Sequence, residues 1–386
     1  MKLHETPLLP SGFLCAARNC GLKTSGEDLS LFAADHPCSA AGLFTRNHFP
    51  GAPILLGRER LRGGILQAVV VNSKVSNVAT GTAGVEDARR MGSAAARELG
   101  IPEELVLVGS TGVIGRRLPL ERIEAGLSGM KEDLQPDPLP GARGIMTTDR
   151  VPKAFSLEVD GAVVSVVGKG AGMIAPNLAT MLVFFFTDAE VGASELGGIL
   201  REAASDTFQT LSVDTDTSTS DMVVALASGA AGPQARLGEA FALLSRTMAE
   251  AVARDGEGAT KLLRVRVTGA ADREEAVGVA RAVVDSPLIK TMAFGADPNV
   301  GRILMAVGKC VDSDIRPERV RAWLQGIPVV DAGQVAAFPE DELRGLLRGD
   351  PVEIRVELGV GDGEATALGC DLTEGYVEEN AAYASS

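Results

Sequence analysis

A threonine at position 180 stands between a glycine-rich segment and an unbroken apolar run. The segment, residues 169–172, carries one lysine among its glycines, and the run covers residues 181–186. An apolar run of this length, bounded by polar residues, predicts a strand buried on both faces. A hydroxyl at such a junction would be held still yet remain within reach of a substrate, as a nucleophile must be. A β-branched residue that merely opens a strand is the alternative, and this stretch alone does not decide between them.

The base that a hydroxyl nucleophile requires is not a histidine here. The chain has three histidines, His4, His36 and His48, all near the N-terminus and none in a glycine-rich context. They support neither a Ser-His-Asp triad nor a histidine zinc site. Cleavage between Ala179 and Thr180 would supply a base instead, because a new α-amine has a reference pKa of about 7.7–8.0 and is partly neutral in the cytosol.

A second group of hydroxyls follows a predicted strand at residues 105–108. The sequence from Gly109 to Gly115 is Gly-Ser-Thr-Gly-Val-Ile-Gly, with Thr111 and Gly112 near its centre. A strand that runs into a glycine-rich turn exposes backbone N–H groups, which can hold an anion or an oxyanion. A tight turn without chemistry is the alternative on this pattern alone.

Two further segments are excluded as nucleotide or calcium sites by their spacing. Lys169 is followed by glycine instead of Ser or Thr, and the glycines at 161 and 168 do not fit a P-loop. Residues 168–172 also lack the strand–turn–helix context of a dinucleotide site. Residues 212–221 are rich in aspartate and hydroxyls, but the glycine and terminal glutamate of a calcium loop are missing.

The composition excludes several classes of protein. A net charge of −14 and a pI near 4.8 argue against binding to nucleic acid or to anionic membranes. No stretch reaches the roughly twenty apolar residues of a membrane span, and the N-terminus lacks the apolar core of a signal peptide. Five scattered cysteines without a Cys-x-x-Cys pair are typical of reduced thiols. We therefore expect a cytoplasmic protein.

Hydrophobic periodicity and turn residues give the elements that must position these groups. Strands are expected as short pieces within 10–50, at 66–71, 105–108 and 262–267, and as a hairpin at 157–167 that turns at Asp160-Gly161. Helices are expected at 84–99, 118–130, 193–209, 237–253, 274–284 and 303–308. Residues 136–140 are expected to form a proline-rich loop, and 254–260 to form the main boundary.

At least five separated motifs resemble, in order, those of the glutamate N-acetyltransferase (ornithine acetyltransferase) family of arginine biosynthesis. They are Ser-Thr-Gly-Val-Ile-Gly at 110–115, Met-Thr-Thr-Asp at 146–149, Ala-Thr-Met-Leu at 179–182, Gly-Ala-Asp-Pro-Asn-Val-Gly-Arg at 295–302, and the C-terminal tail. Together they cover nearly the whole chain. The resemblance implies an α/β protein of the ornithine acetyltransferase type, a layered sandwich with a smaller C-terminal α/β domain.

The resemblance also implies a role for each matching residue. Thr180 is the nucleophile, freed by self-cleavage of the bond between Ala179 and Thr180. The Thr111 hydroxyl and the Gly112 N–H form the oxyanion hole. The residues implied to bind substrate are Thr147, Lys169, Thr180, Asn380 and Ser385, the last two on a tail that enters the active site. No metal or cofactor is implied.

The implied organisation is a catalytic domain at 1–258 and a C-terminal domain at 259–386. Self-cleavage would give an alpha chain of residues 1–179 and a beta chain starting at 180, assembled as α2β2 or a larger homo-oligomer. The implied reaction moves an acetyl group from N-acetylornithine to glutamate by a ping-pong mechanism, with acetyl-CoA as a further candidate donor. The alternatives are a related acyltransferase or amidohydrolase with other substrates, and an uncleaved paralogue that acts as a binding protein.

Three places depart from the family pattern. Lys74 stands where the family usually has glycine, within the Asn-Ser-Lys-Val-Ser-Asn stretch at 72–77. Ala296 stands where the family often has a substrate-contacting glutamate. Both changes make the local charge more positive, which predicts weaker binding of a donor that carries an amine, such as N-acetylornithine. The alternative is that Lys74 lies at the surface and that Asp297 or the acidic segment 214–221 replaces the lost negative charge. Ser385 replaces a usual threonine and keeps the hydroxyl.

Overall fold

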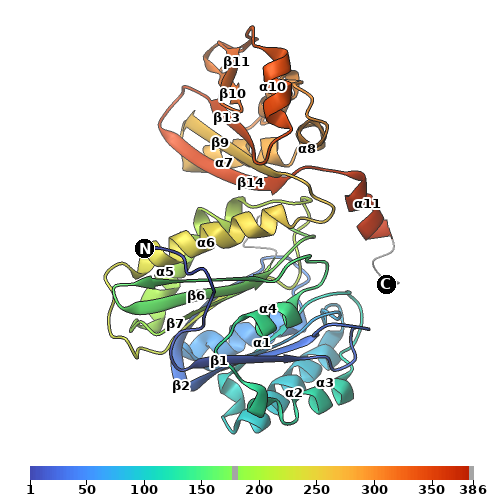
Figure 1. The fold of residues 1–386 in the computed structure, drawn as a ribbon, viewed down its shortest axis with the longest axis vertical. Helices are drawn as coiled ribbons and strands as arrows, with labels where there is room; N and C mark the ends of the chain where they lie inside the picture. Colours follow the sequence, from blue (N-terminus) through green and yellow to red (C-terminus); the bar gives the residue numbers. More distant parts are fainter. Residues whose placement is uncertain (176–180, 382–386) are drawn as a thin grey trace. The chain divides into compact units, whose positions relative to one another are not determined.

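Two β-sheets organise the chain, and each belongs to a separate unit (Figure 1). The computed structural model describes residues 1–175 and 181–381. Among these, the first unit holds residues 1–170, 181–205 and 217–248, and the second holds 171–175, 206–216 and 249–381. The expected α/β class, with a smaller second α/β part, is confirmed.

The first unit contains an eight-stranded mixed sheet whose order is β4-β3-β2-β8-β7-β6-β5, with β1 paired to β2. Its strands are β1 Phe13–Arg18, β2 Leu29–Phe44, β3 Ile65–Asn72, β4 Val106–Ser110, β5 Lys153–Val159, β6 Ala162–Lys169, β7 Leu182–Thr187 and β8 Met222–Ala227. Its helices are α1 Ala52–Arg60, α2 Gly81–Leu99, α3 Leu120–Leu127, α4 Leu139–Ile145, α5 Ala193–Ser205 and α6 Leu237–Arg254, the last of which continues into the second unit. The pairs β3–β4 and β7–β8 are parallel, so their carboxyl ends lie at one edge in each pair.

Strand β7 is buried on both faces, as the apolar run predicts. Phe184 and Phe186 join one core cluster with Phe32 of β2. On the opposite face, Phe185 stacks on Phe241 of α6 with ring centroids 4.8 Å apart. Side chains alternate between faces along a strand, so only a strand with partners on both sides can bury three successive phenylalanines. This burial fixes the strand that begins just after the predicted nucleophile.

Three expectations from the sequence are wrong in detail. Residues 29–44 form one sixteen-residue strand, not short pieces, with a register shift against β3 between Ala33 and Cys38. Helix α4 begins within the predicted proline-rich loop, because Pro140 occupies its first turn, where no N–H is needed. Helix α5 ends at Ser205, and a short 3₁₀ turn follows at Phe208–Thr210.

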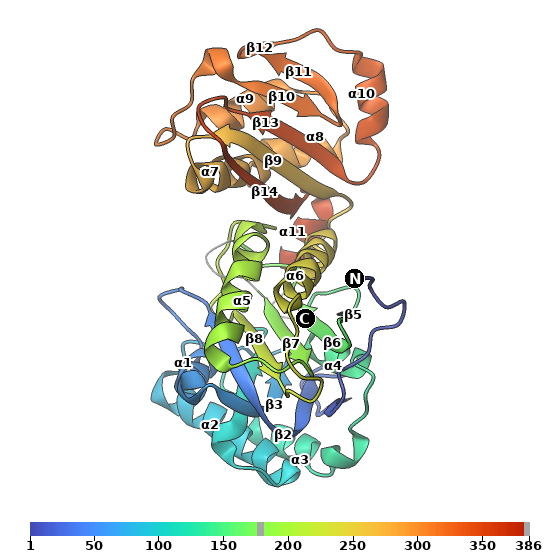
Figure 2. The same cartoon turned by 90° about the vertical axis from the view of Figure 1, so that its left-hand side faces the viewer.

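The second unit contains a six-stranded sheet of order β12-β11-β10-β13-β9-β14 (Figure 2). Its strands are β9 Leu262–Ala270, β10 Arg321–Leu324, β11 Ile327–Asp331, β12 Gln334–Val335, β13 Val352–Glu357 and β14 Gly363–Cys370. Its helices are α7 Arg273–Val284, α8 Pro287–Phe294, α9 Gly301–Gly308, α10 Glu340–Leu347 and α11 Glu374–Ala381. Helix α7 packs on β9 and β14, and apolar residues of β9, β10 and β13 join α7–α9 in one core.

The remaining predicted elements agree with the structure to within a few residues at each end. The hairpin of β5 and β6 turns at Asp160 and Gly161, which both have positive φ. Over residues 1–175 and 181–381, no helix has the length and apolar character of a membrane span. Cys15 and Cys38 are buried free thiols, and burial raises the pKa of each to about 12.

Candidate active site

The predicted oxyanion residues follow β4 and lie beside the end of β3. The two strands are parallel neighbours, with Asn72 and Ser110 in register. Ser110 Oγ donates a 2.6 Å hydrogen bond to Asn72 Oδ1, and the Thr111 N–H donates to the Asn72 carbonyl at 3.1 Å. Thr111 is nearly buried. Its backbone is therefore fixed by the neighbouring strand and not by its own side chain.

Gly112 packs directly against the loop that follows β3. Its φ of 130° is one that L-residues rarely adopt, and a Cβ at this position would overlap the carbonyl carbon of Lys74. The Val113 N–H donates to the Lys74 carbonyl at 3.0 Å and locks the two loops together. In the described parts of the chain, neither the Thr111 hydroxyl nor the Gly112 N–H donates a hydrogen bond. Two adjacent donors without an acceptor are what an oxyanion hole requires.

Replacing Gly112 with alanine is expected to lower the free energy of unfolding by about 2–4 kcal/mol, because backbone strain and steric overlap add. Gly115→Ala is the matched control, since Gly115 also has positive φ but has no atom within 4 Å of an added Cβ. It should cost about 1 kcal/mol. Urea unfolding of both variants measures the difference, and equal losses would show that the contact with Lys74 does not matter.

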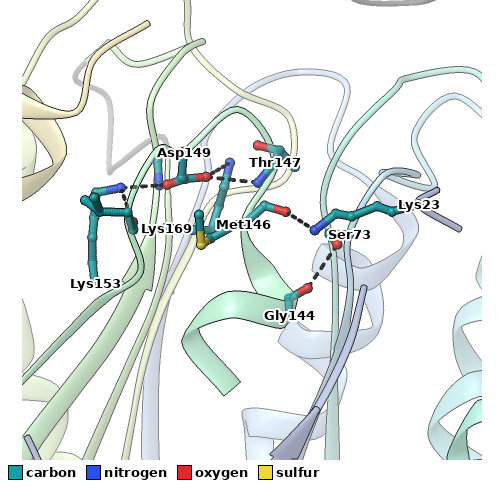
Figure 3. A network of polar contacts seen from close by, with 10 residues as sticks. Lys23, Ser73, Gly144, Met146, Thr147, Asp149, Lys153 and Lys169 are labelled. Carbon is teal, nitrogen blue, oxygen red and sulfur yellow. Dashed lines mark hydrogen bonds and ion pairs between the residues drawn. The ribbon is translucent and has the colours of Figure 1, made fainter. Parts of the chain in front are cut away.

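Thr147 and Lys169, two of the residues expected to bind substrate, meet at the carboxylate of Asp149 (Figure 3). Asp149 Oδ2 accepts the Thr147 N–H at 3.0 Å and lies 3.9 Å from Lys169 Nζ. Asp149 Oδ1 accepts the Gly170 N–H at 2.7 Å and the Lys153 ammonium at 2.8 Å. The side chain of Asp149 is fully buried. One carboxylate thus joins the 146–152 loop to the end of β6.

Asp149 and Lys153 are functional candidates that sequence reasoning missed. Burial alone would raise the pKa of Asp149, but the charges of Lys169 and Lys153 and the hydrogen bonds hold it below its usual range. Asp149 closes the Met-Thr-Thr-Asp motif, so its place in the sequence carried a signal. No sequence pattern pointed to Lys153, because a lysine at the start of a strand is normally exposed to solvent.

A third lysine, Lys23, ties the same loop to the N-terminal part of the sheet. The Lys23 ammonium donates to the carbonyls of Met146 and Glu27, each at 2.8 Å, and burial lowers its pKa (Figure 3). Ser73 Oγ donates to the Gly144 carbonyl at 2.9 Å. Since Ser73 precedes the loop that contacts Gly112, these bonds connect the oxyanion residues to the Thr147–Lys169 cluster. All of these groups belong to the first unit.

The acidic segment 212–221 has three aspartates, of which Asp214 and Asp216 belong to the second unit and Asp221 to the first. Asp214, in the second unit, accepts the N–H groups of Met173 and Ile174 at 2.6 and 2.8 Å. Asp221 directly precedes β8 and is fully buried, and burial raises its pKa well above the usual range. The N–H of the next residue, Met222, donates to the Met181 carbonyl at 3.0 Å. Asp221 therefore lies beside the residue that follows the predicted nucleophile.

The predicted tail residue Asn380 lies on α11 in the second unit. Its amide donates to Glu257 at 2.7 Å and to the Tyr376 carbonyl at 3.0 Å. Glu257 also lies against Gly172, because a Cβ on Gly172 would overlap its carboxylate unless that side chain moved. The predicted scissile pair Ala179 and Thr180, and the tail residue Ser385, fall outside the described residues.

Two of the three departures from the family pattern lie in different settings. Lys74 has a φ of 76°, a left-handed conformation that glycine adopts without strain and lysine does not. Ala296 is 8% exposed and belongs to the core of the second unit, also with positive φ. Among the residues that the structure describes, no three His, Cys, Asp or Glu side chains gather as a metal site.

Comparison with known proteins gives matches along almost the entire chain. The model of the ArgJ family matches residues 14–385. The arginine biosynthesis bifunctional protein ArgJ 2 of Nostoc sp. is 43% identical over 387 residues, covering 97% of this chain and 98% of that protein. Glutamate N-acetyltransferase Oat2 of Streptomyces clavuligerus is 42% identical, with 98% and 99% covered. A crystal structure of arginine biosynthesis bifunctional protein ArgJ from Bacillus halodurans is 41% identical, with a TM-score of 0.49, and covers 51% of this chain and 96% of that one.

Proposed function

The chain belongs to the ArgJ family, the glutamate N-acetyltransferases (ornithine acetyltransferases) of arginine biosynthesis, and from this premise we propose that it moves an acetyl group from N-acetylornithine to glutamate. The observation that carries the proposal is the pair of donors at Thr111 and Gly112 that have no acceptor in residues 1–175 and 181–381, joined through neighbouring loops to the buried cluster around Lys169. Acetyl transfer needs an oxyanion site, because a tetrahedral intermediate forms on the acetyl carbonyl. It also needs a site for a carboxylate, because both proposed substrates are amino acids.

The first proposed step matures the enzyme. Thr180 Oγ attacks the carbonyl carbon of Ala179, the peptide C–N bond breaks, and water hydrolyses the resulting ester. The products are an alpha chain of residues 1–179 and a beta chain with a free N-terminal Thr180. The residues on either side of the proposed cut support this step. Residues 171–175 belong to the second unit, whereas β7 is hydrogen-bonded to β6 and β8 in the first sheet. We retain 1–258 and 259–386 as the proposed domains.

The second proposed step is acyl transfer. The α-amine of Thr180 takes the proton of Oγ, which attacks the acetyl carbonyl of N-acetylornithine. The Thr111 hydroxyl and the Gly112 N–H stabilise the oxyanion, and the bond to ornithine breaks as its amine takes up the proton. Glutamate then attacks the acetyl ester through its own amine and restores free Thr180. Lys169 receives a substrate carboxylate in each half-reaction, and Asn380 and Ser385 complete the proposed substrate contacts.

Intact-mass measurement after incubation with N-acetylornithine tests this function. The expected result is two chains, with the mass of one acetyl group added to the chain that begins at Thr180, and loss of that mass when glutamate is added. A single chain that never gains an acetyl group would favour an uncleaved binding protein. We also propose an α2β2 or larger assembly in the cytoplasm, in keeping with the buried free thiols, and light scattering would measure its size.

One observation favours a second candidate donor that carries less positive charge than N-acetylornithine. Lys74 brings a cation to the loop that contacts Gly112, at a backbone conformation suited to glycine. Removing this charge with Lys74→Gly should raise kcat/KM for N-acetylornithine about fivefold, as expected for one repulsion of about 1 kcal/mol in water. Lys74→Arg is the charge-retaining control. Steady-state kinetics with acetylornithine, acetyl-CoA and neutral N-acetyl amino acids would reveal another donor, and no change in Lys74→Gly would leave acetylornithine as the preferred one.

A further inference from the structure

We propose that Asp149 is a positioning residue for substrate binding, whose buried carboxylate holds the Lys169 ammonium and the Thr147 backbone in place while Lys153 supplies its counter-charge. The inference rests on the proposed function, because it assigns how the carboxylate-binding lysine of that site is held. It adds two residues, Asp149 and Lys153, to those that the motifs identify.

The two lysines beside Asp149 are bound in different ways. Lys153 Nζ lies 2.8 Å from Oδ1, within hydrogen-bond distance, and its side chain is 1% exposed. Lys169 Nζ lies 3.9 Å from Oδ2, which is too far for a hydrogen bond, and its side chain is 9% exposed. Within the described residues, the Lys169 ammonium donates no hydrogen bond. It is therefore attracted to Asp149 and still has its N–H donors available for a ligand.

The β5–β6 hairpin explains why both lysines reach one carboxylate. Lys153 is the first residue of β5 and pairs with Gly168, and Lys169 is the last residue of β6. The two side chains therefore start from the same end of the hairpin. The Gly170 N–H, one residue further, binds the same carboxylate oxygen as Lys153. Asp149 thus binds the backbone N–H groups of Thr147 and Gly170 and also attracts the Lys169 ammonium.

The charged groups around Lys169 favour a carboxylate ligand, because only the distant Oδ2 of Asp149 forms an ion pair with its ammonium among the described residues. The facing groups are Asp149, Lys153, the Lys23 ammonium and Asp221. Asp221 has no hydrogen-bond partner for Oδ2 among the described residues, and burial raises its pKa, which disfavours its charged form. The ammonium groups of Lys153, Lys169 and Lys23 all interact with the Asp149 carboxylate, while Asp28 and Glu27 also act on Lys23. A substrate carboxylate would pair with the Lys169 ammonium, whereas loss of Asp149 would leave Lys169 and Lys153 without the carboxylate that they share.

Two substitutions with opposite expected effects test the proposal. Asp149→Asn keeps the size of the side chain but removes its charge, so we expect KM for glutamate and for N-acetylornithine to rise about 10- to 100-fold with kcat changed less than about threefold. The Lys169 amine should also react faster with acetic anhydride at pH 7, measured by peptide mass spectrometry relative to the exposed Lys309, because less of it remains protonated. Lys153→Met leaves Asp149 with Lys169 alone, so the same labelling should become slower than in the wild type.

Opposite changes in labelling separate an electrostatic role from simple loosening of the loop. If labelling rises in both variants, or if Asp149→Asn lowers kcat and leaves KM unchanged, the positioning role is wrong. Asp149→Glu, which keeps the charge, should recover at least part of the wild-type KM. Labelling does not depend on acetyl transfer, so a wild type that transfers no acetyl group would refute the proposed function without deciding this test.

Discussion

Replacing Thr180 with alanine is expected to leave the protein as one uncut chain and to lower acetyl transfer by about 10⁴-fold or more, the scale seen when an enzyme loses its nucleophile. The substitution removes both the hydroxyl that would attack Ala179 and the hydroxyl that would carry the acetyl group. Denaturing gels should show two fragments for the wild type and one chain of 386 residues for the variant. Intact-mass measurement should place the wild-type cut between Ala179 and Thr180.

Thr180→Ser is the matched control for this prediction. Serine keeps a hydroxyl and, after cleavage, an α-amine, so this variant should still be cut and should retain part of the activity. The buried strand β7 begins two residues later and is held by β6 and β8, so neither substitution should unfold the sheet. A wild type that stays at full length after prolonged incubation would contradict the proposed maturation. Cleavage of Thr180→Ala at the same bond would show that another group attacks it.

Replacing Thr111 with alanine is expected to lower kcat about 10²–10³-fold, the usual effect of losing one preorganised oxyanion donor. The fold should persist, because the Thr111 N–H is held by the Asn72 carbonyl and the hydroxyl makes no hydrogen bond to the described residues. KM should change little, since the oxyanion exists only in the transition state and intermediate. Steady-state kinetics and the unfolding midpoint together measure these effects.

Two further variants distinguish a donor from a packing residue at position 111. Thr111→Ser keeps the hydroxyl and should retain most of kcat, whereas Thr111→Val keeps the shape and should behave like Thr111→Ala. The same loss should appear in both half-reactions, because the oxyanion forms in acylation and again in deacylation. An unchanged kcat in Thr111→Val would place the oxyanion site elsewhere in the molecule.

Much of the local structure could be predicted because short-range chemistry dictates it. The apolar run at 181–186 predicted a strand covered on both faces, and Asp160-Gly161 provided the two positive φ values of a tight turn. The spacing of apolar residues likewise predicted α2 and α6. The predicted element bounds were wrong where strands distant in the sequence determine the structure. Strand β2 runs through sixteen residues because β1, β3 and β8 all pair with it, and a single segment shows none of them.

The candidate site divides in the same way between sequence and tertiary structure. Motif order predicted roles for Thr111, Gly112, Thr147 and Lys169 and identified the family to which the chain belongs, because these residue types and spacings are read one segment at a time. Only the folded chain placed Asp149 between Lys153 and Lys169, and brought Lys23 to the carbonyl of Met146, a residue 123 positions away. A buried ion cluster depends on distances across several strands and on the exclusion of water. The local residue pattern predicts neither these distances nor the exclusion of water, so only the tertiary structure determined which charged groups lie together.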